Sequence, residues 1–282
     1  MAEPPADLTD AERTARYWGR DDLVRVVLDA LEAAGKDLDA LGVEDLAATD
    51  QFHGGGRPAT LRLAELAGLH EPAPGGAARR VLDVGGGLGG PARTLAGRFG
   101  CEVTVVDLTE SYVAVAEELT RRVGFADRVR HQVADALALP FPDASFDVVW
   151  TQNSGMNIAD KASLYRGFRR VLRPGGVLAF QEPMAGDVSP PHFPVMWADD
   201  ESMHHVWPPE QVRALLQELG FVERVWEYAT ESTSSGNAPP PPPHAAQRLI
   251  MGDEKLAAIA AANRRNLEEG RSCTVHAVFV RP

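Results

Sequence analysis

Residues Val81–Gly90 read VLDVGGGLGG, and this stretch decides the fold class. A short apolar run enters a glycine-rich turn, and the segment after it, PARTLAGRF, has the composition of a helix. Glycine lets a backbone approach a ligand closely, and the N–H groups at a helix start point toward it. The turn is ambiguous by itself, because Gly85, Gly87 and Gly90 fit GxGxxG while Gly85, Gly87 and Gly89 fit GxGxG.

Short apolar strands alternate with helices on both sides of this turn. The pattern predicts strands at 78–84, 101–107, 128–136, 146–152, 177–183, 221–229 and 273–280, and helices at 91–99, 110–122, 161–172, 209–219 and 245–269. Such alternation is typical of a mostly parallel sheet that is covered by helices on both faces. The sequence therefore predicts an α/β fold of the doubly wound kind.

Composition and charge exclude several classes of protein. The 282 residues include 44% hydrophobic and 24% charged side chains, which is ordinary for a globular chain, and the net charge is −12. Because an acidic chain without basic runs repels phosphate backbones, we expect no nucleic-acid partner. Two distant cysteines, Cys101 and Cys273, argue against a disulfide framework or a thiolate metal site. No signal-like segment or apolar run of about 20 residues occurs, so we expect a cytoplasmic protein without a membrane partner.

Each of the first three predicted strands contains one aspartate at or near its carboxyl end. Asp107 ends the second strand about 20 residues beyond the glycine turn, where a carboxylate meets ribose hydroxyls in dinucleotide-binding units. Its alternative role is to cap the helix at 110–122. Asp83 lies inside the first strand, where it could hold an ammonium group, and Asp135 ends the third. The turn Arg173–Gly176 then precedes the fifth strand.

This ordered set resembles the class I S-adenosylmethionine-dependent methyltransferases over residues 77–182. The resemblance implies a Rossmann-like sheet of seven strands, mostly parallel with the last antiparallel, and S-adenosyl-L-methionine as cofactor at the carboxyl ends of the central strands. The chain is most similar to the small-molecule branch that includes sarcosine/dimethylglycine and phosphoethanolamine N-methyltransferases. Three segments carry that likeness: DQFHGGGRPAT, DVGGGLGGPARTLA and VVWTQNSGMNIADKASLYRGFRRVLRPGG.

The resemblance also implies which residues bind the cofactor. The matching positions are Asp83, Gly85, Gly87, Gly89 and Gln152 for the amino-acid and ribose parts, Asp107 for the ribose hydroxyls, and Leu108, Asp135 and Ala136 for the adenine. In this branch a segment like Gln51–Gly56 and an N-terminal aromatic residue close over the cofactor. That similarity points to Phe52 and His53, together with Tyr17 and Trp18, although the last two could equally serve only helix packing.

The chain departs from its relatives after the fourth strand. Where they often carry an Asp and a His that bind and deprotonate an amine, this sequence has Asn153 and Asn157. Because asparagine cannot act as a general base, substrates of the phosphoethanolamine and glycine type are disfavoured. Asn153 and Asn157 are expected to contact the substrate instead.

Candidate catalytic groups come from the fifth strand, the long segment behind it and the segment before the glycine turn. We expect Glu182, His192 and His53 to act in catalysis, and Glu182, His192, Trp197 and His204 to contact the substrate. Each histidine could equally be a surface residue. His204 and His205 are adjacent, but a matching carboxylate–histidine spacing is missing, so no metal site is expected.

These patterns predict two parts in the chain. Residues 1–76 would form an N-terminal helical lid, and residues 77–282 a cofactor-binding core with a substrate-pocket insertion at 184–208; the Pro-rich segment 230–244 is expected to be an extended excursion. The expected reaction is methyl transfer to N, O or C of a small molecule. Two alternatives are a non-methylating enzyme such as a cyclase and a nicotinamide-dependent oxidoreductase. A homodimer is one option that the sequence leaves open.

Overall fold

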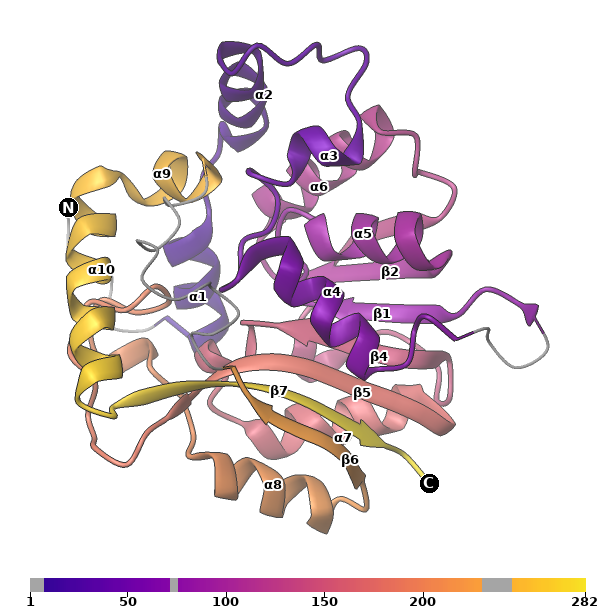
Figure 1. The fold of residues 1–282 in the computed structure, drawn as a ribbon, viewed down its shortest axis with the longest axis vertical. Coiled ribbons are helices and arrows are strands. Elements are labelled where there is room, and N and C mark those ends of the chain that lie inside the picture. Colours follow the sequence, from indigo (N-terminus) through magenta and orange to yellow (C-terminus); the bar gives the residue numbers. More distant parts are fainter. Residues whose placement is uncertain (1–7, 72–75, 230–244) are drawn as a thin grey trace.

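A seven-stranded sheet organises the protein (Figure 1). The computed structural model describes residues 8–71, 76–229 and 245–282, so the predicted Pro-rich excursion lies outside the described residues. The strand order is β3-β2-β1-β4-β5-β7-β6. The strands are β1 (Arg80–Val84), β2 (Glu102–Asp107), β3 (Val129–Val133), β4 (Phe146–Gln152), β5 (Leu172–Ala185), β6 (Val222–Tyr228) and β7 (Ser272–Val280).

Strand direction follows the prediction. The strands β1 to β5 pair in parallel, and β7 runs antiparallel to both β5 and β6, so the last strand alone is reversed in this sheet. The order changes direction at β1, which has β2 on one side and β4 on the other. Ligands of such sheets bind outside the carboxyl ends of the strands at this switch point. The predicted α/β fold is confirmed.

Helices cover the two faces of the sheet because successive strand residues point to opposite sides. One face packs against α7 (Lys161–Val171) and α8 (Pro209–Glu218), with Val149 and Phe180 in its core. The other packs against α4 (Gly56–Leu66) and α5 (Gly90–Phe99), with Trp150 in its core.

A third apolar cluster lies beyond the sheet and forms a cap. It joins α1 (Asp10–Trp18) and α2 (Leu23–Ala33) to α6 (Glu110–Arg122) and to residues Val195–Ala198. The short helix α3 (Val43–Leu46) adds Leu46 to the same cluster. Since α4 packs on the sheet, only part of residues 1–76 belongs to this cap, and the predicted domain division remains a prediction.

The C-terminal helix is interrupted, in contrast to the prediction. The expected helix at 245–269 is two helices, α9 (Ala245–Met251) and α10 (Asp253–Glu268). Gly252 between them has φ +79°, a conformation that a continuing helix cannot contain. Both helices lie beside α1 in Figure 1, on the cap side of the molecule.

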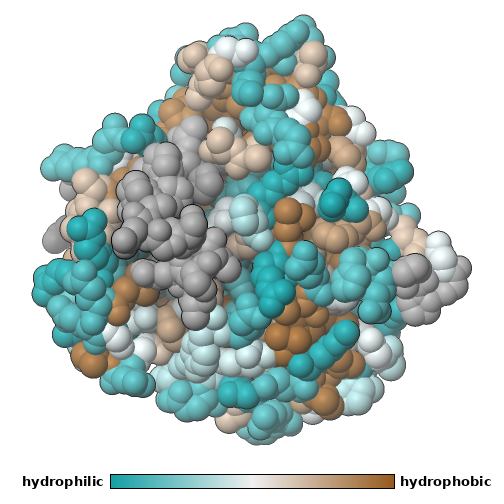
Figure 2. All heavy atoms as spheres, viewed as in Figure 1, coloured by the Kyte–Doolittle hydropathy of each residue, from teal (hydrophilic) through white to brown (hydrophobic). Residues whose placement is uncertain are grey.

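One face of the surface is largely hydrophilic. On the face drawn in Figure 2 hydrophilic side chains cover most of the area, and hydrophobic ones form small separate patches. None of the helices in the described ranges is both long and apolar enough to cross a bilayer.

Candidate functional site

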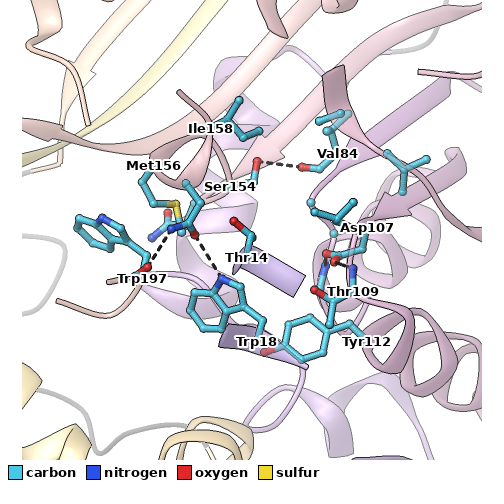
Figure 3. Close-up of a pocket in the computed structure, with 18 of the residues that line it drawn as sticks. Thr14, Trp18, Val84, Asp107, Thr109, Tyr112, Ser154, Met156, Ile158 and Trp197 are labelled. Atoms are coloured by element: carbon cyan, nitrogen blue, oxygen red, sulfur yellow. Dashed lines mark hydrogen bonds between the residues drawn. The ribbon is translucent and has the colours of Figure 1, made fainter. Parts of the chain in front are cut away.

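One cavity lies at the carboxyl ends of β1, β2 and β4, beneath the cap (Figure 3). It encloses about 260 Å³. Its walls come from the segments after these strands, from α1, from Phe52 and His53, and from Met196 and Trp197. This cavity therefore lies at the switch point of the sheet, where the ligand is predicted to bind.

The glycine turn after β1 needs glycine for two geometric reasons. Gly85 has φ +71°, and a Cβ on it would lie 2.3 Å from the Cβ of Ser154. At Gly90, a Cβ would lie 2.4 Å from the carbonyl oxygen of Asp50. The turn is thus packed tightly between the segment after β4 and residues 49–53.

Asp107 holds the glycine turn in place. Its Oδ2 accepts a hydrogen bond from the backbone N–H of Gly87 at 2.9 Å, and its Oδ1 accepts one from the N–H of Thr109 at 2.8 Å. The N-cap residue of α6 is Thr109, so the alternative role of Asp107 as the helix cap is wrong. Burial raises the pKa of this carboxyl, while the two N–H donors oppose that effect.

Asp83 brings an unsatisfied carboxyl to the cavity. The side chain is buried at 1% exposure, and within the described residues its Oδ2 has no hydrogen-bond partner. Burial, reinforced by the nearby Asp107, raises the pKa of Asp83 to about 8. Two further lining atoms, Tyr112 Oη and Asn153 Oδ1, also lack partners there. Because buried polar atoms normally have partners, these three fit a polar ligand with a cationic group.

A buried ion pair fixes residues 49–53 above the turn. Arg93 Nη2 lies 2.8 Å from Asp50 Oδ2, and both side chains are 1% exposed or less. The guanidinium also donates to the carbonyl of Leu88 and to Thr120 Oγ1. The segment that carries Phe52 and His53 is therefore tied to the glycine turn itself.

His53 and Gln152 belong to one buried hydrogen-bond network. His53 Nε2 lies 3.0 Å from Thr60 Oγ1, and its Nδ1 lies 3.3 Å from Gln152 Nε2. Gln152 Nε2 donates to Gln181 Oε1 at 2.7 Å. Both His53 and Gln152 line the cavity, as expected for the pair.

The aromatic residue over the cavity is Trp18, not Tyr17. Trp18 lines the cavity and packs edge-on against Phe52, with ring centroids 5.7 Å apart. Tyr17 is not among the lining residues, and its hydroxyl donates to the carbonyl of Met196 at 3.2 Å. The expectation for Tyr17 needs this correction, because neighbouring helix residues point about 100° apart.

Asn157 connects the two sides of the cap. Its Oδ1 accepts from Trp18 Nε1 at 3.2 Å, and its Nδ2 donates to the carbonyls of Trp197 at 2.8 Å and Met203 at 3.1 Å. It lines the cavity, but its amide is already occupied by these three bonds. Asn153, at φ +54°, also lines the cavity, and its amide oxygen has no partner among the residues that the structure describes.

Glu182 supports the segment after β4 and is not a lining residue. Its Oε1 accepts from the backbone N–H groups of Ser154 at 3.1 Å and Gly155 at 2.9 Å. Lys161 Nζ donates to the carbonyls of Gly155 and Ile158 in the same segment. Burial raises the pKa of Glu182. The expected catalytic contact of Glu182 is therefore replaced by a supporting one.

The remaining predicted residues lie partly outside the cavity. His192 Nε2 is 2.8 Å from Glu269 Oε2, and His204 stacks on Trp197, whose Nε1 donates to His204 Nδ1 at 3.2 Å. Neither histidine lines the cavity, whereas Trp197 does. Burial lowers the pKa of His204 to about 4. The expectations for His192 in catalysis and substrate contact, and for His204 in substrate contact, need correction, since Glu269 binds the imidazole of His192 and the indole of Trp197 lies against His204.

The predicted cofactor residues are otherwise together. The lining includes Asp83, Gly85, Gly87, Asp107, Leu108, Asp135 and Ala136. Gly89 is absent from it: it precedes α5 at φ +78°, and a Cβ there would meet Arg93 at 2.8 Å. Asp135 accepts from the N–H of Leu137 at 2.8 Å. In the described ranges no group of three or more His, Cys, Asp or Glu side chains is arranged to hold a metal ion.

Several lining residues were not predicted. Thr14, Tyr112, Ser154 and Met156 come from three separate parts of the chain. Ser154 Oγ donates to the carbonyl of Val84 at 3.3 Å, so it closes the space beside the glycine turn (Figure 3). The helical spacing of Tyr112 with Val115 and Leu119 could have indicated a buried face, but no sequence signal marks the others.

A family model described as "Methyltransferase domain" matches residues 82–180. Methyltransferase GfsG of Streptomyces halstedii is 40% identical over 114 residues, 40% of this chain and 41% of that protein. The sarcosine/dimethylglycine N-methyltransferase of Halorhodospira halochloris is 35% identical over 151 residues, 52% of this chain and 53% of that protein. The chain thus spans about half the length, or less, of these curated relatives.

Among solved structures, the geranyl diphosphate C-methyltransferase of Streptomyces coelicolor A3(2) has a TM-score of 0.69 at 18% identity, over 99% of this chain and 100% of that one. The [4+2]-cyclase SpnF has a TM-score of 0.64 at 22% identity, over 98% and 97% of the two chains. At these identities the likeness shows a shared fold.

Proposed function

We propose that the protein, whose residues 82–180 match the methyltransferase domain model, transfers a methyl group from S-adenosylmethionine to N, O or C of a small molecule. One observation carries the proposal: Oδ2 of the buried Asp83 carboxyl has no partner within the described residues, and Asp83 lines the cavity together with Asp107. A donor with an ammonium and a sulfonium group supplies the positive charge that this pair of acids lacks.

The chain's own residues are arranged to hold such a donor. The backbone of Gly85 and Gly87 leaves room for its amino-acid and ribose parts, and Asp107 has remaining lone pairs for the ribose hydroxyls. Leu108 and Asp135 would flank the adenine. His53 and Gln152 lie on the side of the cavity that the segment 49–53 closes, where they would bind the amino-acid end.

The bound donor supplies an activated methyl group, and displacement of that methyl needs no acid for the leaving group. What the protein contributes is alignment and exclusion of water. Trp18, Phe52 and Tyr112 form an aromatic wall. The ring centroids of Trp18 and Phe52 are 5.7 Å apart, and those of Phe52 and Tyr112 are 6.0 Å apart. This aromatic wall covers one side of the cavity.

Mass spectrometry of the product tests this function. Purified protein with S-adenosylmethionine and a set of small hydroxyl, amine and activated-carbon compounds is expected to yield S-adenosylhomocysteine and a product heavier by one methyl group. A rearranged product of unchanged mass would instead favour a cyclase. Binding of NADH in place of S-adenosylhomocysteine, measured by calorimetry, would favour an oxidoreductase.

The cellular setting belongs to the same proposal. The net charge of −12 supports a protein without a nucleic-acid partner, and we propose a cytoplasmic location. Cell fractionation tests the location. A homodimer remains a prediction, which light scattering on the full chain tests.

A further inference from the structure

The cavity has a second side, opposite the glycine turn, which we name the acceptor side. It is formed by α1, by residues 156–160 and by Met196–Trp197. Apolar groups make up most of its wall, among them Trp18, Met156, Ile158 and Trp197 (Figure 3). Thr14 contributes a hydroxyl that lies between Ser154 and Trp18 in this view. A wall of this kind favours an apolar molecule with few polar groups.

The charges on the acceptor side are negative. Asp10 and Asp160 line it, and neither Lys nor Arg occurs among the described lining residues. Two neighbouring basic groups already have partners: Arg13 pairs with Asp10, and Lys161 Nζ donates to two backbone carbonyls. A phosphate or carboxylate in this space would find no charged donor to replace its hydration.

Helix N-termini could also bind an anion, but those facing the acceptor side are occupied by carboxylates. At the start of α1 the Glu12 carboxylate accepts from the N–H of Thr9 at 2.8 Å. The Asp160 carboxylate accepts from the N–H of Ser163 at 2.9 Å at the start of α7. In the short turn Gly155–Asn157, the N–H groups of Ser154 and Gly155 donate to Glu182.

We infer that the methyl acceptor is a largely apolar molecule that carries no anionic group on the part that enters the cavity. This inference rests on the proposed function, which assigns the glycine-turn side to the methyl donor and the opposite side to the methyl acceptor. Three features support this inference. The wall is mostly apolar, its charged lining residues are acidic, and carboxylates of the protein already accept hydrogen bonds from nearby backbone N–H groups. Neutral hydroxyl and basic amine compounds therefore fit, while phosphorylated and carboxylated ones are rejected.

A matched pair of fluorescent probes tests the charge rule without turnover. N-phenyl-1-naphthylamine and 1-anilinonaphthalene-8-sulfonate share their ring system and differ in one sulfonate. With protein saturated by S-adenosylhomocysteine, we expect one equivalent of the uncharged probe to bind at least tenfold more tightly than the sulfonate. Equal or tighter binding of the sulfonate overturns the inference, and so does failure of both probes to bind.

Variants at one lining position show where the probes bind. Ala159 is exposed and lines the acceptor side, so Ala159→Arg places a cation there, and Ala159→Gln is the uncharged control. We expect the arginine variant to reduce the difference between the probes at least fivefold and the glutamine variant to preserve it. An unchanged difference in the arginine variant overturns the inference. Calorimetry with S-adenosylhomocysteine alone tests the proposed function separately, since failure to bind it would reject that function.

Discussion

Trp18 Nε1 and Asn157 Oδ1 are joined by a hydrogen bond of 3.2 Å between residues that are 139 positions apart. The same amide holds the backbone of Trp197 and Met203. One asparagine therefore connects the N-terminal helix, the segment after β4 and the segment behind β5. All three segments form walls of the cavity, so the position of the cap over the cavity depends on this side chain.

Asn157→Ala is expected to weaken the cap. Three hydrogen bonds are lost, and each contributes about 1 kcal/mol, so urea denaturation should show a loss of about 3 kcal/mol. Dissociation of S-adenosylhomocysteine in stopped flow should also accelerate, because α1 is released. Trp18→Phe is the matched control: it removes one donor and should cost about a third as much. Identical behaviour of Asn157→Ala and wild type would contradict the role of the amide.

Asp107→Ala is expected to reduce cofactor affinity. The change removes the acceptor for the ribose hydroxyls and leaves the N–H groups of Gly87 and Thr109 without their partner. Hydrogen bonds to a charged group contribute about 1.5–3 kcal/mol each, so calorimetry should show affinity for S-adenosylhomocysteine about 100-fold weaker. Asp135→Ala, at the edge of the same cavity, should have a smaller effect. Unchanged affinity in Asp107→Ala would show that the ribose binds elsewhere.

Asp83 makes stability depend on pH. Its folded-state pKa is about 8, and a carboxyl in the unfolded chain has a pKa of about 4. Between these values the folded protein binds one more proton than the unfolded chain, so stability without ligand should fall as pH rises from 5 to 8. Asp83→Asn should remove this part of the slope. Urea denaturation of both proteins at several pH values provides the measurement; parallel curves would contradict the assignment.

Removal of one partner of the Asp50–Arg93 pair should lower the free energy of unfolding more than replacement of both partners by apolar residues. Asp50→Asn leaves the guanidinium of Arg93 buried at 0% exposure without its counter-charge, which typically costs about 3–5 kcal/mol. The double variant Asp50→Leu with Arg93→Met removes both charges and should recover part of that loss. Cofactor affinity should fall in both, because residues 49–53 lose their connection to the glycine turn. If the double variant lost as much free energy of unfolding as the sum of the two single substitutions, the two side chains would not be coupled.

Glu182→Gln separates a supporting role from a catalytic one. The amide oxygen can still accept from Ser154 and Gly155, so turnover of the acceptor found by mass spectrometry should stay within about threefold of wild type. A general base at this position would instead contribute about 100-fold or more. Glu182→Ala should lower stability by about 2 kcal/mol, since two buried N–H groups lose their partner. An altered pH–rate profile in Glu182→Gln would restore the catalytic interpretation.

Local patterns in the sequence determined the sheet and the part of the cavity next to the glycine turn. Alternating strands and helices imply parallel pairing, and parallel strands bring their carboxyl ends to one edge. For that reason Asp83, Gly85, Gly87 and Asp107 could be placed together from the sequence. Gly89 could not be separated from them, because its contact with Arg93 depends on how α5 packs.

The cap and the acceptor side were decided by tertiary structure. Whether Tyr17 or Trp18 faces the cavity depends on the rotation of α1, and the sequence carries no signal for that rotation. Glu182 lies at the carboxyl end of a central strand, as a catalytic acid would, yet two N–H groups of a separate segment occupy it. His192 turns away from the cavity because it pairs with Glu269, 77 positions along the chain, and His204 does so because it stacks on the neighbouring Trp197. Strand periodicity is a local property, whereas these side-chain directions follow from long-range contacts.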